Sequence, residues 1–238
     1  MRQKLKRQKK SRGRTPSDSR PNTREKIKAI ATKLLITQGV RGFSYADIAE
    51  RLDITTTNIH HHFGNKERLV DEVVQEYVAD ASNRHKKIWT DSSLALSEKI
   101  EKFVAFNFER YSRFNPGKRE GRPWSLIGRL RLESEALSAQ SVRALASFGS
   151  DVQEFIHVAV TQARNEGELR KDTPVTDIAL LLANMVNSTA IFTQVSGNFT
   201  VVRDCFGSAT RVIFSGYGTN GTSSLVAKAT YGGVERVS

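Results

Sequence analysis

The sequence predicts an all-α protein with an N-terminal three-helix helix-turn-helix domain and a larger C-terminal helical domain. Apolar residues recur at helical spacing in most segments, and no segment has the alternating pattern of a convincing strand. Residues 44–66 (SYADIAERLDITTTNIHHHFGNK) have the pattern of two short helices joined by a tight turn. At 238 residues, 38% of them hydrophobic, the chain can form a substantial core.

The first helix is expected over residues 23–38. Its apolar face consists of Ile27, Ile30, Ala31, Leu34 and Leu35, which is an amphipathic pattern. Gly39 ends this helix, and Val40 and Phe43 are expected to fill the small core beneath the following helices.

The second helix is expected to begin after Ser44, which can cap it together with Asp47 three residues later. Its apolar face consists of Tyr45, Ile48, Ala49 and Leu52. Asp53 and Ile54 make the turn, because aspartate tolerates a left-handed backbone better than most residues, though less well than glycine.

The third helix is short and carries several polar side chains. Thr55 can cap its start, Gly64 suits its end, and only Ile59 and Phe63 are expected to point inward. The remaining positions, expected outside, are Thr56, Thr57, Asn58, His60 and His61. Such a helix, with two apolar anchors and many exposed donors, is typical of the helix that enters the DNA major groove.

Longer helices account for most of the remaining chain. One is expected from Lys66, after the cap Asn65, to Trp89. The others are expected over residues 93–114, 124–135, 138–166, 175–195 and 201–215. Proline and glycine interrupt the pattern at 115–123, Gly167 ends the helix expected over 138–166, and RKDTP (170–174) is a second break. The domain boundaries that we expect are 1–21 (disordered basic arm), 22–68 (helix-turn-helix domain), 69–216 (helical domain) and 217–238 (flexible tail).

The order of these features resembles the DNA-binding domain of TetR-family transcriptional regulators. An apolar helix leads through GVRGFS (39–44) and the two-helix unit to HHHFGNKERL (60–69). The resemblance is specific over about residues 23–75, and beyond them only the all-helical pattern agrees. It implies a cytoplasmic homodimer that binds a palindromic operator in double-stranded DNA. It also implies a C-terminal domain that receives a small molecule, which usually relieves repression.

The resemblance also implies which residues contact DNA. These are Ser44, Tyr45, Thr55, Thr56, Thr57, Asn58, His60, His61 and Lys66. Asn58 can pair with an adenine edge, and Lys66 lies where a phosphate is expected. Two positions depart from the family pattern, because Asp53 replaces the usual glycine and His60 the usual tyrosine.

Positive charge is concentrated at the start of the chain. The net charge is +12, and residues 1–28 contain twelve Lys or Arg against Asp18 and Glu25, a local excess of +10. We favour an arm that adds phosphate contacts beside the helix-turn-helix. A solvated tail without function and a targeting or membrane-surface patch are the alternatives.

The last two helices have broad apolar faces that favour a four-helix interface between two subunits. The residues expected there are Ile178, Leu182, Met185, Phe192, Val202, Phe206, Ala209 and Ile213. The alternative is that one of these helices is buried within a single chain.

An effector pocket is expected among aromatic side chains of the C-terminal domain, although ordinary core packing is the alternative for each. The candidates are Trp89, Phe103, Phe106, Tyr111, Trp124, Phe148, Phe155 and Phe192. They predict an apolar or aromatic effector. Arg129, Arg131 and His157 could bind an anionic end of the effector, but we do not favour them.

No enzyme, metal or cofactor motif is present. The sequence has no GxSxG and no glycine-rich phosphate loop, and Glu133 and Glu135 are expected to be solvated. Consecutive histidines at 60–62 point in different directions on a helix and cannot chelate one ion. The single Cys205 fits a reducing cytoplasm and is expected to be a buried, inert thiol.

We also expect no secretory signal and no membrane span, because no run of 18 apolar residues occurs. The alternative function is a helical interaction protein that uses its basic tail to bind RNA or anionic membranes.

Overall fold

The structure is a computed structural model that describes residues 22–117 and 121–219. The expected basic arm (1–21) lies outside the described residues, and so does most of the expected tail. The described residues contain helices and no strand, which confirms the all-α prediction. Leu169 and Gly218 form an isolated bridge.

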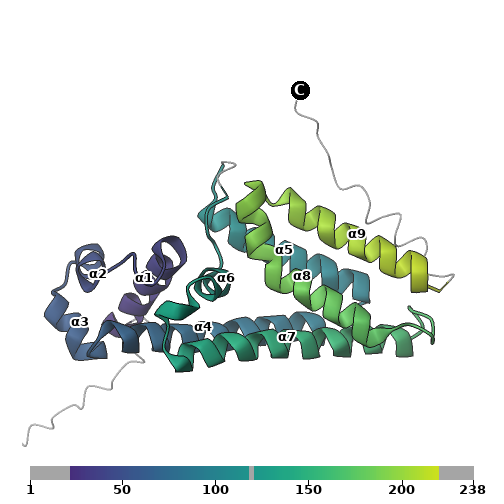
Figure 1. Ribbon diagram of the computed structural model, residues 1–238, viewed down its shortest axis with the longest axis horizontal. Helices are drawn as coiled ribbons and strands as arrows, with labels where there is room; N and C mark the ends of the chain where they lie inside the picture. The colour runs from purple at the N-terminus through teal and green to yellow at the C-terminus, as the bar shows by residue number, and fades with distance from the viewer. Residues whose placement is uncertain (1–21, 118–120, 220–238) are drawn as a thin grey trace, which may run out of the picture.

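The N-terminal domain consists of α1 (Thr23–Gln38), α2 (Tyr45–Leu52), α3 (Thr56–Phe63) and the first turns of α4 (Lys66–Trp89). It lies at one end of the molecule (Figure 1). The caps explain the helix bounds. Asn22, Thr55 and Asn65 each accept a hydrogen bond from a backbone N–H in the first turn of α1, α3 and α4.

The C-terminal domain contains the remaining helices. These are α5 (Leu96–Phe114), α6 (Leu126–Arg131), the short 3₁₀ helix η1 (Ser134–Ala136), α7 (Ala139–Asn165), α8 (Val175–Ser196) and α9 (Thr200–Tyr217). The long helix α4 leaves the N-terminal domain and runs beside α7, and α5, α8 and α9 gather at the far end (Figure 1).

Two expected helices are shorter in the structure. Residues 91–95 form a turn in which Asp91 accepts hydrogen bonds from the N–H and hydroxyl of Ser93, so α5 starts only at Leu96. Trp124 precedes α6, where its buried indole donates to Thr193 Oγ1 at 2.7 Å. The helix expected to reach residue 135 ends at Arg131.

The end of α9 lies beyond the expected boundary at residue 216. The helix continues to Tyr217, whose carbonyl accepts from the N–H of Arg170 at 2.8 Å. The N–H of Thr219 donates to the carbonyl of Glu168 at 3.1 Å. The first residues of the expected tail are therefore paired with the loop before α8.

Ion pairs fasten α1 to α4. Arg24 pairs with Glu72, and Lys28 Nζ lies 2.6 Å from Glu76 Oε1. Burial opposes the charge of Lys28, but hydrogen bonds to Glu76 and Glu25 raise the pKa of Lys28 above its ordinary value. These pairs are 48 residues apart in sequence, and the helical periodicity gave no sign of them.

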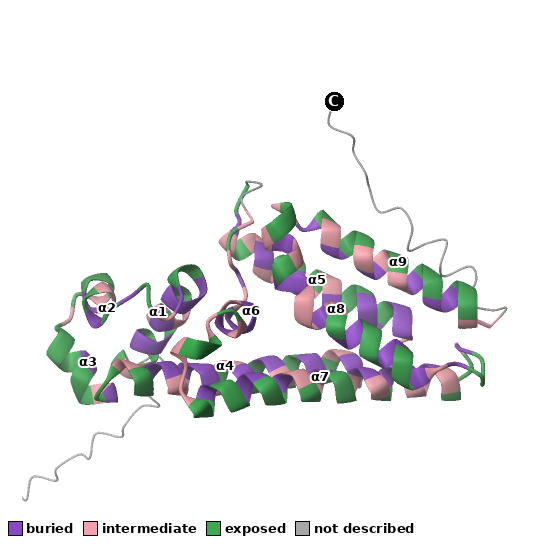
Figure 2. Ribbon diagram, in the orientation of Figure 1, coloured by how far each residue is buried: buried purple, intermediate pink, exposed green. Residues whose placement is uncertain are grey.

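The apolar faces of α8 and α9 point largely into the chain itself, as the burial colours of Figure 2 show. Five residues expected at a subunit interface are buried in the monomer core: Ile178, Leu182, Val202, Phe206 and Ile213. The other three are partly buried: Met185, Phe192 and Ala209. Most of the residues expected at the interface therefore already pack within a single chain, because helix periodicity cannot tell a core face from an interface face. Which residues form a subunit interface stays a prediction. Cys205, expected to be buried, is partly exposed.

A different apolar surface remains open on these two helices. Leu181, Val195 and Val212 are 66%, 84% and 71% exposed. By length and composition alone, α8 also qualifies as a membrane span, with a mean hydropathy of 1.5 in its most apolar window, of which 44% is buried. The sequence had indicated no such segment.

Candidate DNA-binding surface and effector cavity

The α3 helix presents a polar surface on an apolar base. Ile59 and Phe63 are buried at 0% and 3% exposure and hold the helix on the domain core. The exposed residues are Thr55, Thr56, Thr57, Asn58, His60 and His61. Thr55 Oγ1 accepts from the N–H of Asn58 at 3.2 Å, so its hydroxyl also caps the helix. Hydrogen-bonding side chains thus cover the exposed side of α3.

His60 is held in a defined orientation. Its Nδ1 lies 2.6 Å from the carbonyl oxygen of Gly64, and its ring meets the Tyr45 ring edge-on at 4.8 Å. Because a carbonyl oxygen only accepts, Nδ1 carries the hydrogen and Nε2 is left for another partner.

Like Thr55 and His60, three further residues expected to contact DNA also make contacts inside the domain. Asp47 Oδ2 accepts from both the N–H and the hydroxyl of Ser44, and these bonds lower the pKa of Asp47. Tyr45 is largely buried. Lys66 Nζ donates to the carbonyl of Phe43 and lies 4.3 Å from the Phe43 ring centre, and burial lowers the pKa of Lys66.

Arg24 supports α3 in a way that the sequence did not indicate. Its Nη1 donates to the carbonyl of His62 at 2.6 Å, and its guanidinium lies 4.4 Å from the centre of the Phe63 ring. Arg24 also pairs with Glu72, and that hydrogen bond raises the pKa of Arg24. One side chain therefore links α1, α4 and the end of α3.

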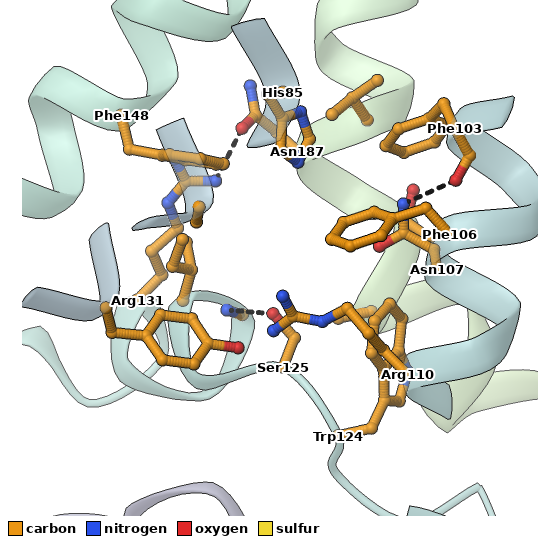
Figure 3. Close-up of a pocket in the computed structure, with 17 residues that line it drawn as sticks. His85, Phe103, Phe106, Asn107, Arg110, Trp124, Ser125, Arg131, Phe148 and Asn187 are labelled. Atoms are coloured by element: carbon orange, nitrogen blue, oxygen red, sulfur yellow. Dashed lines mark hydrogen bonds between the residues drawn. The ribbon is translucent and has the colours of Figure 1, made fainter. Parts of the chain in front are cut away.

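A cavity of about 40 Å³ lies within the C-terminal domain (Figure 3). It is lined by side chains from α4, α5, α6, α7 and α8 and from the segment before α6. The aromatic lining consists of Tyr77, Phe103, Phe106, Trp124 and Phe148. The hydrogen-bonding lining consists of His85, Asn107, Arg110, Ser125, Arg131, Asn187 and Thr189. Its lining is thus more polar than the sequence indicated.

Four of the eight aromatic candidates for the effector pocket line this cavity: Phe103, Phe106, Trp124 and Phe148. The other four do not. Trp89 packs behind Phe103 with ring centres 5.7 Å apart, and Tyr111 packs on Phe199 at 5.4 Å. Phe155 and Phe192 are partly buried against the core. Of the three basic candidates, only Arg131 reaches the cavity.

His85 is a polar group of the cavity that sequence reasoning missed. It is 6% exposed, and its Nδ1 has no hydrogen-bond partner among the described residues. Its ring packs against Phe103 and Phe148, with ring centres 5.6 Å and 5.2 Å away. Burial lowers the pKa of His85 to about 4, so it is neutral at neutral pH.

The segment after α6 touches the N-terminal domain. Glu133 Oε2 accepts from the N–H of Val40 at 2.8 Å, and Glu133 Oε1 pairs with Arg129 Nε at 2.7 Å. Gly39 has a φ of +78°, which favours glycine, and a Cβ atom there would lie 2.1 Å from Glu133 Oε1 and displace that carboxylate. Glu133 was expected to be solvated, and this was wrong. Glu135 is exposed as expected.

Among the described residues, no group of three or more His, Cys, Asp or Glu side chains is placed to hold a metal ion.

Comparison with known proteins points to one family. Residues 27–73 match the family model described as bacterial regulatory proteins, tetR family. A protein named HTH-type transcriptional repressor KstR2, from Rhodococcus jostii, is 29% identical over 86 residues, which is 36% of this chain and 42% of that protein. The protein of the same name from Mycolicibacterium smegmatis is 26% identical over 95 residues, which is 40% of this chain and 45% of that protein. The match spans less than half the length of these relatives.

Solved structures share the fold over most of this chain. Escherichia coli NemR in its reduced form gives a TM-score of 0.68 at 16% identity, covering 79% of this chain and 95% of that one. A TetR transcriptional regulator from Legionella pneumophila gives a TM-score of 0.66 at 23% identity, covering 82% of this chain and 100% of that one. The ketosteroid transcriptional regulator KstR2 of Mycobacterium tuberculosis gives a TM-score of 0.58 at 18% identity, covering 85% of this chain and 98% of that one. At these identities the likeness shows the fold.

Proposed function

Because this chain is a regulator of the tetR family, we propose that it represses transcription as a dimer bound to a palindromic operator. We further propose that a small molecule with an apolar or aromatic body enters the cavity and releases the DNA. The observation that carries the proposal is the exposed polar face of α3 on its buried anchors, Ile59 and Phe63.

The α3 face has the chemistry of a major-groove reader. Asn58 offers a donor and an acceptor in the geometry that an adenine edge requires, and threonine methyl groups suit thymine. His60 presents Nε2 because its Nδ1 is held by Gly64. The basic residues at the start of the chain would add phosphate contacts, which raise affinity without selecting a sequence.

A dimer accounts best for the open apolar surface on α8 and α9. A two-fold pair would cover Leu181, Val195 and Val212 and would present two α3 helices to two half-sites. We favour this over a membrane role for α8, because nearly half of its apolar window already serves the core of this chain. Asn184 and Asn187 on α8 would also be costly in a bilayer.

The position of α6 gives a physical route from the cavity to the DNA-binding domain. Ile127, Gly128 and Arg131 of α6 line the cavity. Two residues later, Glu133 holds the N–H of Val40. A ligand that favours a different position of α6 or α4 would change the placement of the N-terminal domain and hence the spacing of the two α3 helices.

The proposal is tested by binding to DNA from upstream of the chain's own gene. We expect protection of a short palindrome at moderate salt, and Asn58→Ala should weaken specific binding by about 1–3 kcal/mol. Asn83→Ala, at an exposed asparagine of α4, is the matched control and should bind as the wild type does. Equal binding to any polyanion, RNA and anionic vesicles included, would overturn the proposal in favour of a general interaction protein.

A further inference from the structure

The cavity contains two arginine side chains and no carboxylate. Arg110 enters from α5 and Arg131 from α6, and none of the described lining residues is an aspartate or a glutamate. Figure 3 shows both side chains at the border of the same space, together with His85, Phe106 and Asn187. Both arginine side chains are partly buried, and a cation drawn out of water is normally matched by an anion or a set of strong acceptors.

Arg110 has no such match. It makes no hydrogen bond or ion pair with another described residue. Its guanidinium instead lies between aromatic rings, 5.2 Å from the centre of Tyr77 and 5.4 Å from that of Phe106. Burial, and then the neighbouring Arg113, lower the pKa of Arg110 to about 10, so the group is still charged at neutral pH. Its five donors remain available to an acceptor from outside.

Arg131 is bound only to neutral groups. Its Nη1 donates to Asn187 Oδ1 at 2.9 Å and its Nη2 to the carbonyl of Leu145 at 3.3 Å. The guanidinium lies 5.8 Å from the centre of the Phe148 ring. These contacts fix its position without neutralising its charge.

Two further polar atoms of the cavity are buried without a partner among the described residues, the Tyr77 hydroxyl and His85 Nδ1. Both belong to α4, and His85 is more than nine-tenths buried. Because unsatisfied buried polar atoms are rare in folded proteins, two of them beside two unmatched cations indicate a site for a ligand.

We propose that the effector is an organic acid whose carboxylate is bound by Arg110 and Arg131 and whose apolar or aromatic body packs on Phe103, Phe106 and Phe148. The assignment of this ligand as the effector rests on the proposed function. A volume of about 40 Å³ has room for a few water molecules, or for a carboxylate, so a larger body would displace lining side chains. A planar carboxylate also matches the planar fork of a guanidinium.

The first experiment needs no ligand. Replacing Arg110 by methionine keeps much of the side-chain volume and removes the unmatched charge, so Arg110→Met should raise the midpoint of thermal unfolding. Arg113→Met is the matched control on the same helix, where Arg113 is exposed and pairs with Glu109, and it should leave the midpoint unchanged or slightly lower. A clear fall for Arg110→Met alone would assign Arg110 to the core and overturn the proposal.

The second experiment uses matched pairs of probes, phenylacetate with phenylacetamide and octanoate with octanamide, measured by thermal shift and calorimetric titration. We expect at least one acid to bind the wild type and its amide not to bind. Arg110→Met should lose that binding, Arg110→Lys should keep part of it, and Arg113→Met should keep it all. Binding of neither acid, or equal binding of acid and amide, would overturn the proposal.

The acid that binds is then added to the protein–operator complex. Release of the DNA supports both the acid site and its regulatory role. If the acid binds but the complex persists, the site stands and the ligand response in the proposed function is wrong. If the wild type recognises no operator while the acid still binds, only the DNA-binding part of the proposed function fails.

Discussion

Asp53 ends α2 with φ 52° and ψ 50°, the one residue other than glycine at positive φ among the described residues. A Cβ atom crowds the backbone in this region, and aspartate relieves the strain only in part. Asp53→Gly should therefore raise the free energy of unfolding by about 0.5–1 kcal/mol, while Asp53→Val should lower it by about 1–2 kcal/mol, measured by urea denaturation. Asp204→Gly, within helix α9, is the control, and a gain there as well would refute the explanation.

His85 makes stability depend on pH. Its pKa is about 4 in the folded protein and about 6.5 when exposed, so the unfolded chain binds the extra proton first as the pH falls. Stability is therefore full above about pH 6.5 and is lost toward pH 4. Between about pH 7.5 and pH 4.5 the wild type should lose about 2.5 kcal/mol more than His85→Phe.

This comparison isolates His85 because other groups titrate in both proteins. Arg110 and Arg131, which line the same cavity, stay charged throughout this range. Urea denaturation at the two pH values measures the difference. Equal losses in wild type and His85→Phe would mean that His85 is solvated in solution.

Single residues also show which features of the structure the sequence could predict. The outward face of α3 follows from the positions of Ile59 and Phe63, because two anchors at i and i+4 fix the orientation of a short helix. The contacts of Lys66 and Tyr45 could not be predicted from the sequence. Lys66 meets the carbonyl of Phe43, and Tyr45 meets the ring of His60, only because the fold brings them together. For the same reason, the sequence did not indicate the role of Arg24, because the carbonyl that it binds lies 38 residues away in sequence.

At the scale of elements, caps and apolar periodicity predicted the bounds of α1 and α4 correctly. They failed at α6, whose length depends on a contact made by the next residues of the chain. After Arg131 the chain turns so that Glu133 can meet the N–H of Val40, a contact between two domains that no local pattern contains. The cavity beside α6 could not be predicted from a local pattern either, since its two arginines come from different helices.

The Glu133 contact should contribute measurably to stability. Glu133→Ala leaves the N–H of Val40 without its acceptor and Arg129 without its ion pair, so it should cost about 1–2 kcal/mol of unfolding free energy. Glu135→Ala, at the exposed neighbouring carboxylate, should change it by less than about 0.5 kcal/mol. Chemical denaturation of the two variants compares them directly, and equal effects would show that Glu133 is as solvated as Glu135.

For the whole molecule, the arrangement of helices decides which apolar residues can serve a partner. The core takes the inward faces of α8 and α9, so a second subunit is left with the opposite faces. The sequence predicted broad apolar faces on these two helices, but most of the residues it indicated for a partner belong to the core. Their burial depends on how α8 packs on α7 and α9, which the periodicity of one helix does not contain.

The exposed faces lead to a prediction about assembly. A charge at Leu181 and another at Val195 would be buried without partners in the proposed dimer but would remain in water in the monomer. The double variant Leu181→Arg, Val195→Arg should therefore sediment as a monomer, fold normally by circular dichroism, and bind a palindromic operator at least about tenfold more weakly.

The control for assembly is Val158→Arg on α7, at a valine that is 40% exposed and belongs to neither α8 nor α9. It adds one arginine, against two in the double variant, to an apolar surface residue and should leave both the dimer and operator binding intact. Because added arginine also attracts DNA, weaker binding by the double variant cannot arise from its charge and must reflect the loss of the second α3 helix. A double variant that still sediments as a dimer would place the subunit interface on another surface.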